Sequence, residues 1–319
     1  MKGNILFGSA LDFSRHAVNY LHKCKRQHGD IFTIRLLNYH LTIIMDPHCY
    51  EAVSREKNFD FDPIQKQVNW NVFSYVLHNP KKMLKETSKT VKGELLVQSI
   101  SAYLVNLNVA MDALVKVVSQ KSDSVESPQI WNSEGLARFV ASTAFDSIFN
   151  TVFGRDDQHP FNANTIFSNF EIFHKYFNYL WLGFPLGLFS KAAKALQQLL
   201  MSPDSHQLLD RADLSAYMRR AIELMKEQGQ TEADIKSHSL VYLHVNYNTF
   251  RLCVWTLNNI LENDEALKEL RNEIDDFFSH RFDQKTNKIR LEIKDLDALP
   301  ILGGCRFSDP ANLICRLKL

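Results

Sequence analysis

Six side chains that can hydrogen-bond or carry charge recur at helical spacing within the stretch 237–270 of this 319-residue chain. On a wheel of ~3.6 residues per turn they fall on one narrow stripe, made of His244, Asn248, Arg251, Trp255, Asn258 and Glu262. An imidazole, an amide and a guanidinium in one row can bind and orient a polar ligand. The same row can also be the polar edge that an ordinary bundle helix exposes to solvent, and periodicity alone leaves both interpretations open.

The element that must position this stripe is predicted to be a buried central helix. The stretch 237–270 contains neither Pro nor Gly, and we expect it to form the longest helix of the chain, with residues 264–269 as a second helix or an exposed continuation. Most of the circumference outside the stripe is apolar: Leu243, Val245, Leu252, Cys253, Val254, Leu257, Ile260 and Leu261. A helix that is apolar nearly all round is typically buried. Buried polar groups cost free energy when unpaired, so the stripe must meet a partner.

Composition and charge exclude several other classes of protein. The chain has 45% hydrophobic and 23% charged residues, which is an ordinary globular composition. Its net charge is +1, with 37 basic and 36 acidic residues, so no attraction to nucleic acid is implied. Five scattered cysteines without a CxxC pair argue against a disulfide framework and a structural zinc site. No phosphate-binding glycine loop, HExxH or GxSxG motif is present.

The pattern along the chain predicts a mainly α fold with a small early β-sheet. Two runs rich in β-branched residues, Ile31–Leu37 and His40–Met45, are expected to form a hairpin. Asp46 and Pro47 then begin a helix that reaches about Ser54. Residues 59–79 are interpreted as an irregular segment with one short helix. Further helices are predicted over 13–27, 81–119 with a break near Gly93, 134–153, 190–201 and 214–228.

Three other segments have a bearing on function. Aromatic side chains recur at helical spacing over 161–181, a pattern that favours packing in the core. A run of five lysines, Lys81, Lys82, Lys85, Lys89 and Lys92, is either a solvated helix face or a contact for an anionic partner such as a cofactor carboxylate. No signal sequence or membrane-spanning run is visible, so an anchor before Met1 and a soluble chain both stay open. Polar segments at 121–129 and 282–293 are expected to be a linker and a short hairpin, and a helix is expected after Asp295.

Several separate stretches, in their order and spacing from about Gly3 to Leu302, resemble a cytochrome P-450 of the clan that holds prostacyclin synthase and the sterol 7α- and 12α-hydroxylases. These stretches are HGDIFTI (28–34), LTIIMDPHCYEAV (41–53), TVFGRD (151–156), NFEIFHKYFNYLWLGFPLGLF (169–189), Asn248-Thr249 with Trp255, NDEAL (263–267) and LDALPIL (296–302). The resemblance implies a haem-thiolate fold with an apolar pocket for a lipid.

The resemblance also implies a function and a set of site residues. The function is that of a haem-dependent monooxygenase acting on a sterol or a fatty-acid-derived lipid, with an NADPH-dependent reductase as partner and the endoplasmic reticulum membrane as location. The alternative is an endoperoxide isomerase, which needs neither oxygen nor reductase. Asn248 and Thr249 are then the catalytic candidates on the oxygen side of the haem, and the substrate pocket is expected to include His244, Val245, Trp70 and Phe73.

The sequence departs from the family in two places. After Leu302 the resemblance ends, so 1–302 is expected to be a partial cytochrome P-450-like domain and 303–319 an unrelated tail. No Glu has an Arg three positions on, and neither Cys305 nor Cys315 lies in the family's glycine-rich loop. Because a haem-thiolate enzyme needs its axial sulfur, we expect no haem-iron ligand in this chain, a C-terminal truncation and no catalysis by the polypeptide alone. In the central helix, Tyr247 is expected to crowd the haem face, and Arg251 to need solvent or a carboxylate.

Overall fold

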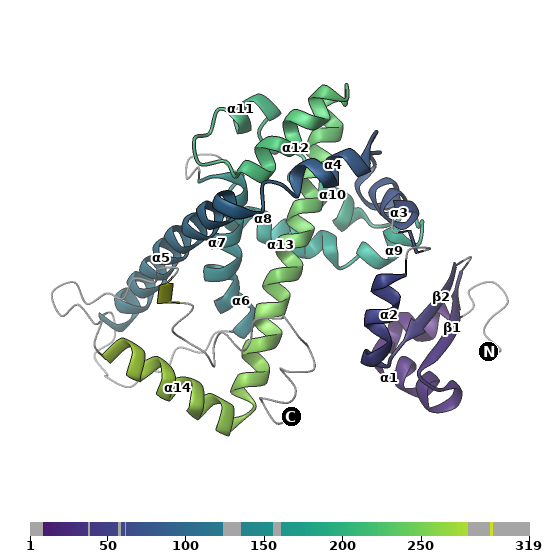
Figure 1. Cartoon of the computed structure of the whole chain (residues 1–319), viewed down its shortest axis with the longest axis horizontal. Helices are drawn as coiled ribbons and strands as arrows, with labels where there is room; N and C mark the ends of the chain where they lie inside the picture. Colours follow the sequence, from purple (N-terminus) through teal and green to yellow (C-terminus); the bar gives the residue numbers. More distant parts are fainter. Residues whose placement is uncertain are drawn as a thin grey trace.

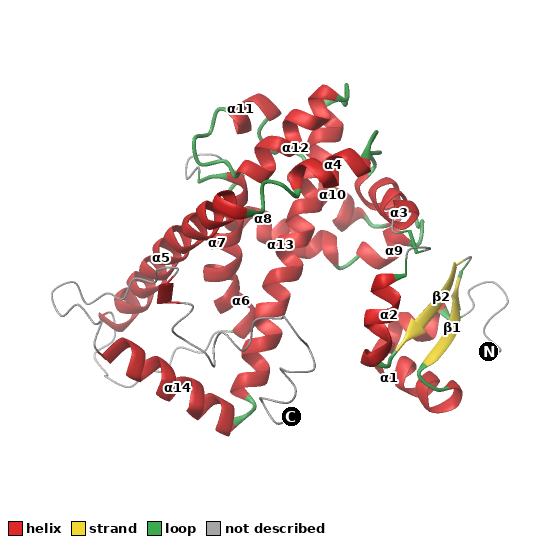
Figure 2. Cartoon of the chain, in the orientation of Figure 1, coloured by secondary structure: helices red, strands yellow, loops and turns green. Residues whose placement is uncertain are grey.

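Helices make up nearly all of the fold, and one small antiparallel sheet lies to one side of them (Figures 1 and 2). The computed structural model describes residues 9–37, 39–56, 59–60, 62–123, 135–155, 161–279 and 294–295. The expectations for 282–293, for the helix after Asp295 and for the tail with Cys305 and Cys315 therefore fall outside the described residues, as does most of the predicted linker.

The sheet confirms the predicted hairpin. Strands β1 (Ile31–Leu36) and β2 (Tyr39–Ile44) pair in antiparallel register, with Ile34 opposite Leu41. Alternate residues of β1, including Ile34 and Leu36, are buried together with Cys24 of α1 (Ala10–His28), because successive strand side chains point to opposite faces. This small cluster is separate from the main core.

The turn after the sheet follows the predicted capping pattern. The Oδ1 atom of Asp46 accepts a hydrogen bond from the backbone N–H of His48 at 3.0 Å, and Pro47 begins a short 3₁₀ turn, η1 (Pro47–Cys49). Helix α2 (Tyr50–Arg55) continues it. The segment predicted to be mostly irregular instead contains a twelve-residue helix, α3 (Asp62–Phe73). Its inward side chains are few, Asn69, Val72 and Phe73, which is too sparse a set to give a recognisable helical period.

The predicted break near Gly93 is confirmed. Helix α4 (Pro80–Thr87) begins at Asn79, whose Oδ1 accepts the backbone N–H of Lys82 at 2.9 Å, and α5 (Gly93–Asp123) follows the interruption. The lysine run lies on the surface, where Lys82 reaches Glu227 at 3.2 Å and Lys89 reaches Glu86 at 2.8 Å. The run is therefore a solvated face with its own carboxylate partners.

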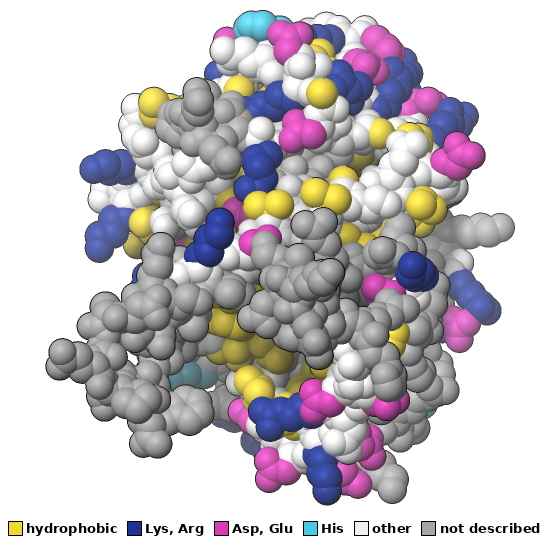
Figure 3. Space-filling view, turned by 90° about the vertical axis from the view of Figure 1, so that its left-hand side faces the viewer, with side chains coloured by type: hydrophobic (Ala, Val, Ile, Leu, Met, Phe, Trp, Pro, Cys, Tyr) yellow, Lys and Arg dark blue, Asp and Glu magenta, His cyan; other side chains and the backbone are white. Residues whose placement is uncertain are grey.

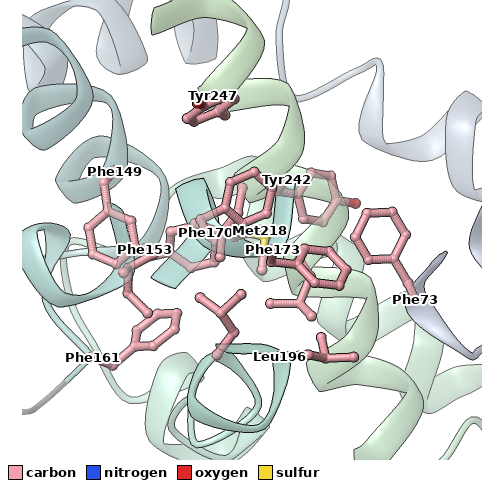
Figure 4. Close-up of a cluster of buried hydrophobic side chains, with 14 of the residues drawn as sticks. Phe73, Phe149, Phe153, Phe161, Phe170, Phe173, Leu196, Met218, Tyr242 and Tyr247 are labelled. Atoms are coloured by element: carbon pink, nitrogen blue, oxygen red, sulfur yellow. The ribbon is translucent and has the colours of Figure 1, made fainter. Parts of the chain in front are cut away.

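Helices from the middle of the chain enclose the main core, in which aromatic rings from α7, α8 and α13 meet (Figure 4). Phe170 and Phe173 are completely buried, so the aromatic repeat packs in the core as predicted. The helix predicted over 134–153 passes through a π turn, η2, and ends at Gly154, which adopts a φ of 76°. The elements of this region are α6 (Leu136–Val140), η2 (Ala141–Phe145), α7 (Asp146–Phe153), α8 (Ala163–His174), α9 (Phe177–Trp181), η3 (Leu186–Leu188), α10 (Ser190–Leu199), α11 (Ser205–Leu209) and α12 (Ala216–Glu227).

The central helix α13 (Glu232–Leu261) runs through the helical part of the molecule and packs against α3, α6, α7 and α11 (Figure 1). A capping box between Thr231 and Asp234 fixes its start, five residues before the predicted one. It ends at Leu261, and α14 (Asp264–Ser279) is the second helix that the sequence allowed. At 30 residues α13 is one residue shorter than α5, so the expectation that it is the longest helix is wrong.

Candidate functional site

The first half of α13 is held by a chain of buried hydrogen bonds. The hydroxyl of Tyr75 lies 2.6 Å from Nδ1 of His238, and Nε2 of the same ring lies 2.8 Å from the hydroxyl of Tyr242. Burial lowers the pKa of His238 to about 3 and raises the pKa values of both tyrosines. The ring is therefore neutral, and both of its nitrogens have partners. These hydrogen bonds join α13 to the segment before α4, and they leave no polar atom of the His238 ring for a ligand.

The second half of α13 has an open face, which we call the open stripe: Val245, Asn248, Leu252 and Trp255. These residues follow one another at helical spacing, and all four are exposed, Val245 by 54%, Leu252 by 43% and Trp255 by 61%. Thr249 lies beside them, is also exposed, and donates its hydroxyl to the carbonyl of Val245 at 3.1 Å. The expectation that α13 is buried all round is therefore correct for its first half and wrong for its second.

The opposite side of this half packs inward. Cys253, Val254 and Leu257 lie against the main core and are only partly exposed. In the space-filling view of Figure 3, hydrophobic side chains show at the bottom of a recess in the lower half of the molecule, with charged side chains nearby. Large apolar side chains exposed in one row are uncommon on a soluble protein, and they mark a surface that contacts something.

Between the two halves, rings from three other helices surround His244. Its imidazole stacks on Phe177 of α9 with centroids 4.4 Å apart and planes 9° apart, and His174 of α8 lies 5.3 Å away. Burial, followed by the charge of His174, lowers the pKa of His244 to about 4. Burial and then the charge of Arg251 lower the pKa of His174. Both rings are neutral near pH 7, so they suit a neutral hydrogen-bonding group better than an anion.

The structure brings some of the predicted site residues together and separates others. Phe73 is buried, with its ring centroid 6.4 Å from that of His244, and His244 directly precedes the open stripe on α13. Asn248 and Thr249 lie on the exposed face of the helix. Trp70 is different: it is 62% exposed on α3 and makes no ring contact with this group in the described part of the chain.

Tyr247 and Arg251 also have defined positions. Tyr247 is 3% exposed and packs against Phe170 at 5.4 Å and Phe250 at 5.7 Å, so it belongs to the core and does not crowd the open stripe. Its position about one-third of a turn from the exposed residues carries its ring inward. Arg251 lies in solvent, one of the two environments expected for it.

Sequence reasoning assigned no site role to His174 and Phe177. Both belong to the aromatic repeat that was interpreted as core packing, and for most of that repeat the interpretation holds. The available signal was His174 itself, an ionisable side chain at helical spacing among phenylalanines. A group of this kind is costly to bury and therefore marks a place to examine.

The cysteines were tested as ligands of a haem iron. Cys24 is buried against the sheet, and burial raises the pKa of the half-buried Cys253, which keeps it a protonated thiol. Burial followed by the nearby Asp46 carboxylate likewise raises the pKa of Cys49. Over the described ranges, no group of three or more His, Cys, Asp or Glu could hold a metal ion. None of these three cysteines fits the thiolate that a haem of this kind requires.

None of the helices that the structure describes is both long enough and apolar enough to cross a bilayer.

A mainly helical domain with one small early sheet and a long central helix is the fold that the resemblance predicted. The family model for cytochrome P450 matches residues 1–305, and the chain belongs to the cytochrome P450 family.

Its curated relatives are distant and longer. The chain is 26% identical to cytochrome P450 7B1 of Mus musculus over 309 residues, covering 92% of this chain and 58% of the relative. It is 26% identical to prostacyclin synthase of Rattus norvegicus over 314 residues, covering 93% and 60%. It is 24% identical to 5-beta-cholestane-3-alpha,7-alpha-diol 12-alpha-hydroxylase of Sus scrofa over 315 residues, covering 95% and 61%. The chain thus spans about three-fifths of the length of these relatives.

Proposed function

We propose that these residues form the lipid-binding part of a haem-thiolate monooxygenase that acts on a sterol or a fatty-acid-derived lipid. The observation that carries the proposal is the open stripe of α13, a row of apolar side chains interrupted by one amide and exposed on a helix whose first half lies in the core. Such a row matches a ligand that is mostly hydrocarbon and carries few oxygen atoms.

Three residues of the open stripe and the neighbouring Thr249 have defined tasks in this proposal. Val245 and Leu252 contact the hydrocarbon and exclude water from it. The side-chain amide of Asn248, one turn from each of them, donates a hydrogen bond to an oxygen of the lipid or accepts one from it. Thr249 already donates its hydroxyl within the helix, so its remaining lone pairs can accept a proton donor from the exposed side.

The described residues fit one side of a haem and not the other. The exposed face around Asn248 and Thr249 suits the side on which the lipid lies, whereas no described cysteine suits the iron. A thiolate-bound haem supplies the oxygen-activating chemistry of this class, and the side chains of α13 would supply binding and orientation. That no cysteine of this chain binds the iron stays a prediction, and the ferrous carbon-monoxide spectrum of the purified chain tests it: a thiolate-type band would contradict it.

Partner and location form part of the same proposal. A monooxygenase takes its electrons from an NADPH-dependent reductase, and a water-insoluble substrate favours work at a membrane, here the endoplasmic reticulum. The relatives whose names refer to sterols, cholesterol 7-alpha-monooxygenase of Cricetulus griseus and the 12-alpha-hydroxylase of Sus scrofa, support the sterol branch. Co-sedimentation of the chain with endoplasmic reticulum vesicles, compared with its behaviour in their absence, tests the location.

Endoperoxide isomerisation is the second candidate, because prostacyclin synthase is as similar to the chain as the sterol hydroxylases are. The two reactions differ in what they consume. A monooxygenase forms product only when a reductase and oxygen are both supplied, whereas an isomerase needs neither. Product that forms without reductase or oxygen would favour the isomerase.

The substrate class is tested by binding. A radiolabelled sterol and a fatty-acid-derived lipid are titrated into the purified chain and into the variants Asn248→Leu and Asn272→Leu. Asn272 is exposed on α14 and serves as the matched control. Loss of one hydrogen bond predicts about tenfold weaker binding for Asn248→Leu and no change for the control. Absence of binding to either lipid, or equal effects of the two substitutions, would contradict the proposal.

A further inference from the structure

We propose that His244 determines substrate specificity by hydrogen-bonding a hydroxyl group of the lipid through its Nδ1 atom. This inference deepens the proposed function and rests on it. It assigns a second polar contact, about one turn before Asn248, and it names the chemical group that is recognised.

The first observation is an unpaired polar atom. Nδ1 of His244 is buried and has no hydrogen-bond partner among the described residues. A buried donor or acceptor without a partner costs about 1–3 kcal/mol, and each such atom in a folded protein needs an explanation. Three other buried side-chain atoms share this condition, and they belong to Ser202, Gln228 and Asn246.

The surroundings of His244 set it apart. Rings from α3, α8 and α9 flank the imidazole: Phe73 at 6.4 Å, Phe170 at 6.4 Å and Phe177 at 4.4 Å between centroids. Apolar rings around one polar atom are the arrangement by which a protein binds a mostly apolar ligand and fixes its orientation. His244 also lies one residue before Val245, where the open stripe begins.

His174 positions the imidazole. Its ring lies 5.3 Å from that of His244, with 24° between the planes, and 4.6 Å from that of Tyr247. The ring of His174 lies on α8 and stays in place when a ring of another helix moves, so it restricts the rotation of His244 before and after a ligand arrives. Such pre-orientation reduces the entropy lost on binding.

Charge selects the group that is recognised. Both histidines are neutral near pH 7 because burial disfavours their charged forms. A neutral imidazole nitrogen either donates or accepts a hydrogen bond, according to the tautomer. A hydroxyl group can pair with either tautomer, because it can itself donate and accept a hydrogen bond. A ketone oxygen only accepts. The charged neighbours of the cluster are Arg251 on α13, which is exposed, and Glu171 on α8, so a carboxylate would pair with Arg251 and not with the imidazole.

The nitrogen is covered in this structure, so the lipid must displace a neighbouring ring to reach it. Helix α9, which carries Phe177, has five residues, whereas α3 and α8 have twelve each. It is the shortest of the elements that flank His244, and the displaced ring is assigned to it.

The test uses three lipids and three proteins. Cholestanol, cholestanone and cholestane share one skeleton and differ in carrying a hydroxyl, a ketone or no oxygen at the same carbon. Each is titrated into the wild-type chain, into His244→Phe and into His206→Phe. The phenyl ring keeps the stacking on Phe177 and removes the nitrogens, while His206 is exposed on α11 and serves as the control.

The expected result has two parts. The wild type and His206→Phe bind cholestanol about tenfold more tightly than cholestane, with cholestanone between them, and His244→Phe binds all three alike. His244→Phe without lipid also melts about 2 °C or more above the wild type, because the unpaired atom is gone. In nitrogen-15 spectra of histidine-labelled chain, cholestanol shifts the Nδ1 resonance of His244 and cholestane does not.

Other results overturn the inference in distinguishable ways. If the wild type binds the three lipids equally, or if His244→Phe keeps the preference for cholestanol, His244 is not the specificity residue and the proposed function stands. If His244→Phe unfolds or melts lower, the ring nitrogen is structural and the inference is wrong. If none of the lipids binds to any of the proteins, the sterol-binding function fails, and the inference fails with it.

Discussion

The two halves of α13 have the same helical backbone conformation but differ in burial. From Ile235 to Leu243 the helix is enclosed, and the polar groups of His238 all have partners. From Val245 onward one face is open, and the nearest buried imidazole, that of His244, has a nitrogen without a partner. The first half shows what a helix needs to be stable inside a core, and the second half departs from that in the ways a ligand would correct.

The largest expected difference between the halves comes from removing one leucine in each. Leu243→Ala deletes a side chain that is 0% exposed and should lower the free energy of unfolding by about 2–5 kcal/mol, since it leaves a cavity. Leu252→Ala deletes one that is 43% exposed and should cost under about 1 kcal/mol. Urea unfolding measures both. Equal losses would mean that the second half is as enclosed as the first.

The buried hydrogen-bond chain gives the next effect. Tyr75→Phe removes the hydroxyl that pairs with Nδ1 of His238 and should cost about 1–3 kcal/mol, because the nitrogen stays buried without a partner. Tyr50→Phe, at an exposed position on α2, is the control and should be nearly neutral. If the two variants unfold at the same urea concentration, the hydrogen bonds of His238 do not stabilise the first half of α13.

Helix α13 carries one histidine in its enclosed first half and one beside the open stripe, and burial lowers the pKa of both, so the free energy of unfolding should depend on pH. The folded-state pKa values of His238 and His244, about 3 and about 4, lie below the ordinary value of 6.5. The unfolded chain therefore binds protons first as the pH falls. This contribution to stability is complete above pH ~6.5 and should decline below it by about 1.4 kcal/mol per pH unit for each histidine.

Unfolding free energies at several pH values between about 6.5 and 5 measure this slope, in a range where few carboxylates titrate. Because the pKa of His174 is also lowered and contributes to the slope, His244→Phe should remove only the share of one histidine, about 1.4 kcal/mol per pH unit, and His206→Phe should leave the slope unchanged. A flat profile for the wild type would show that neither histidine is buried as a neutral ring.

The sequence predicted the elements whose signals are local. Asp46 and Pro47 mark a helix start, Gly154 marks a helix end, and the β-branched runs mark the two strands, because capping, positive φ and strand propensity depend on neighbouring residues alone. Helix α3 is longer than the one short helix expected there, because three inward side chains do not establish a period from which its length could be predicted.

The candidate site was predicted only in part, for a different reason. Periodicity placed Asn248 on a polar stripe of the helix and Val245 outside that stripe, and Tyr247 was expected to crowd the haem face. Burial, however, depends on which distant segments pack against each turn. The exposure of Leu252 and Trp255 and the inward position of Tyr247 follow from those contacts. The stack of His174, His244 and Phe177 joins three helices, and nothing in the local sequence specifies it.

The claim that the open stripe contacts lipid is tested most directly by photolabelling. Cholestanol carrying a photoreactive diazirine is bound to the purified chain, irradiated, and mapped residue by residue with mass spectrometry. The account predicts label on α13 at Val245, Asn248 and Leu252, and none from Ile235 to Leu243. Label spread evenly over exposed apolar side chains elsewhere, such as Leu84 and Val18, with none on the open stripe, would contradict it.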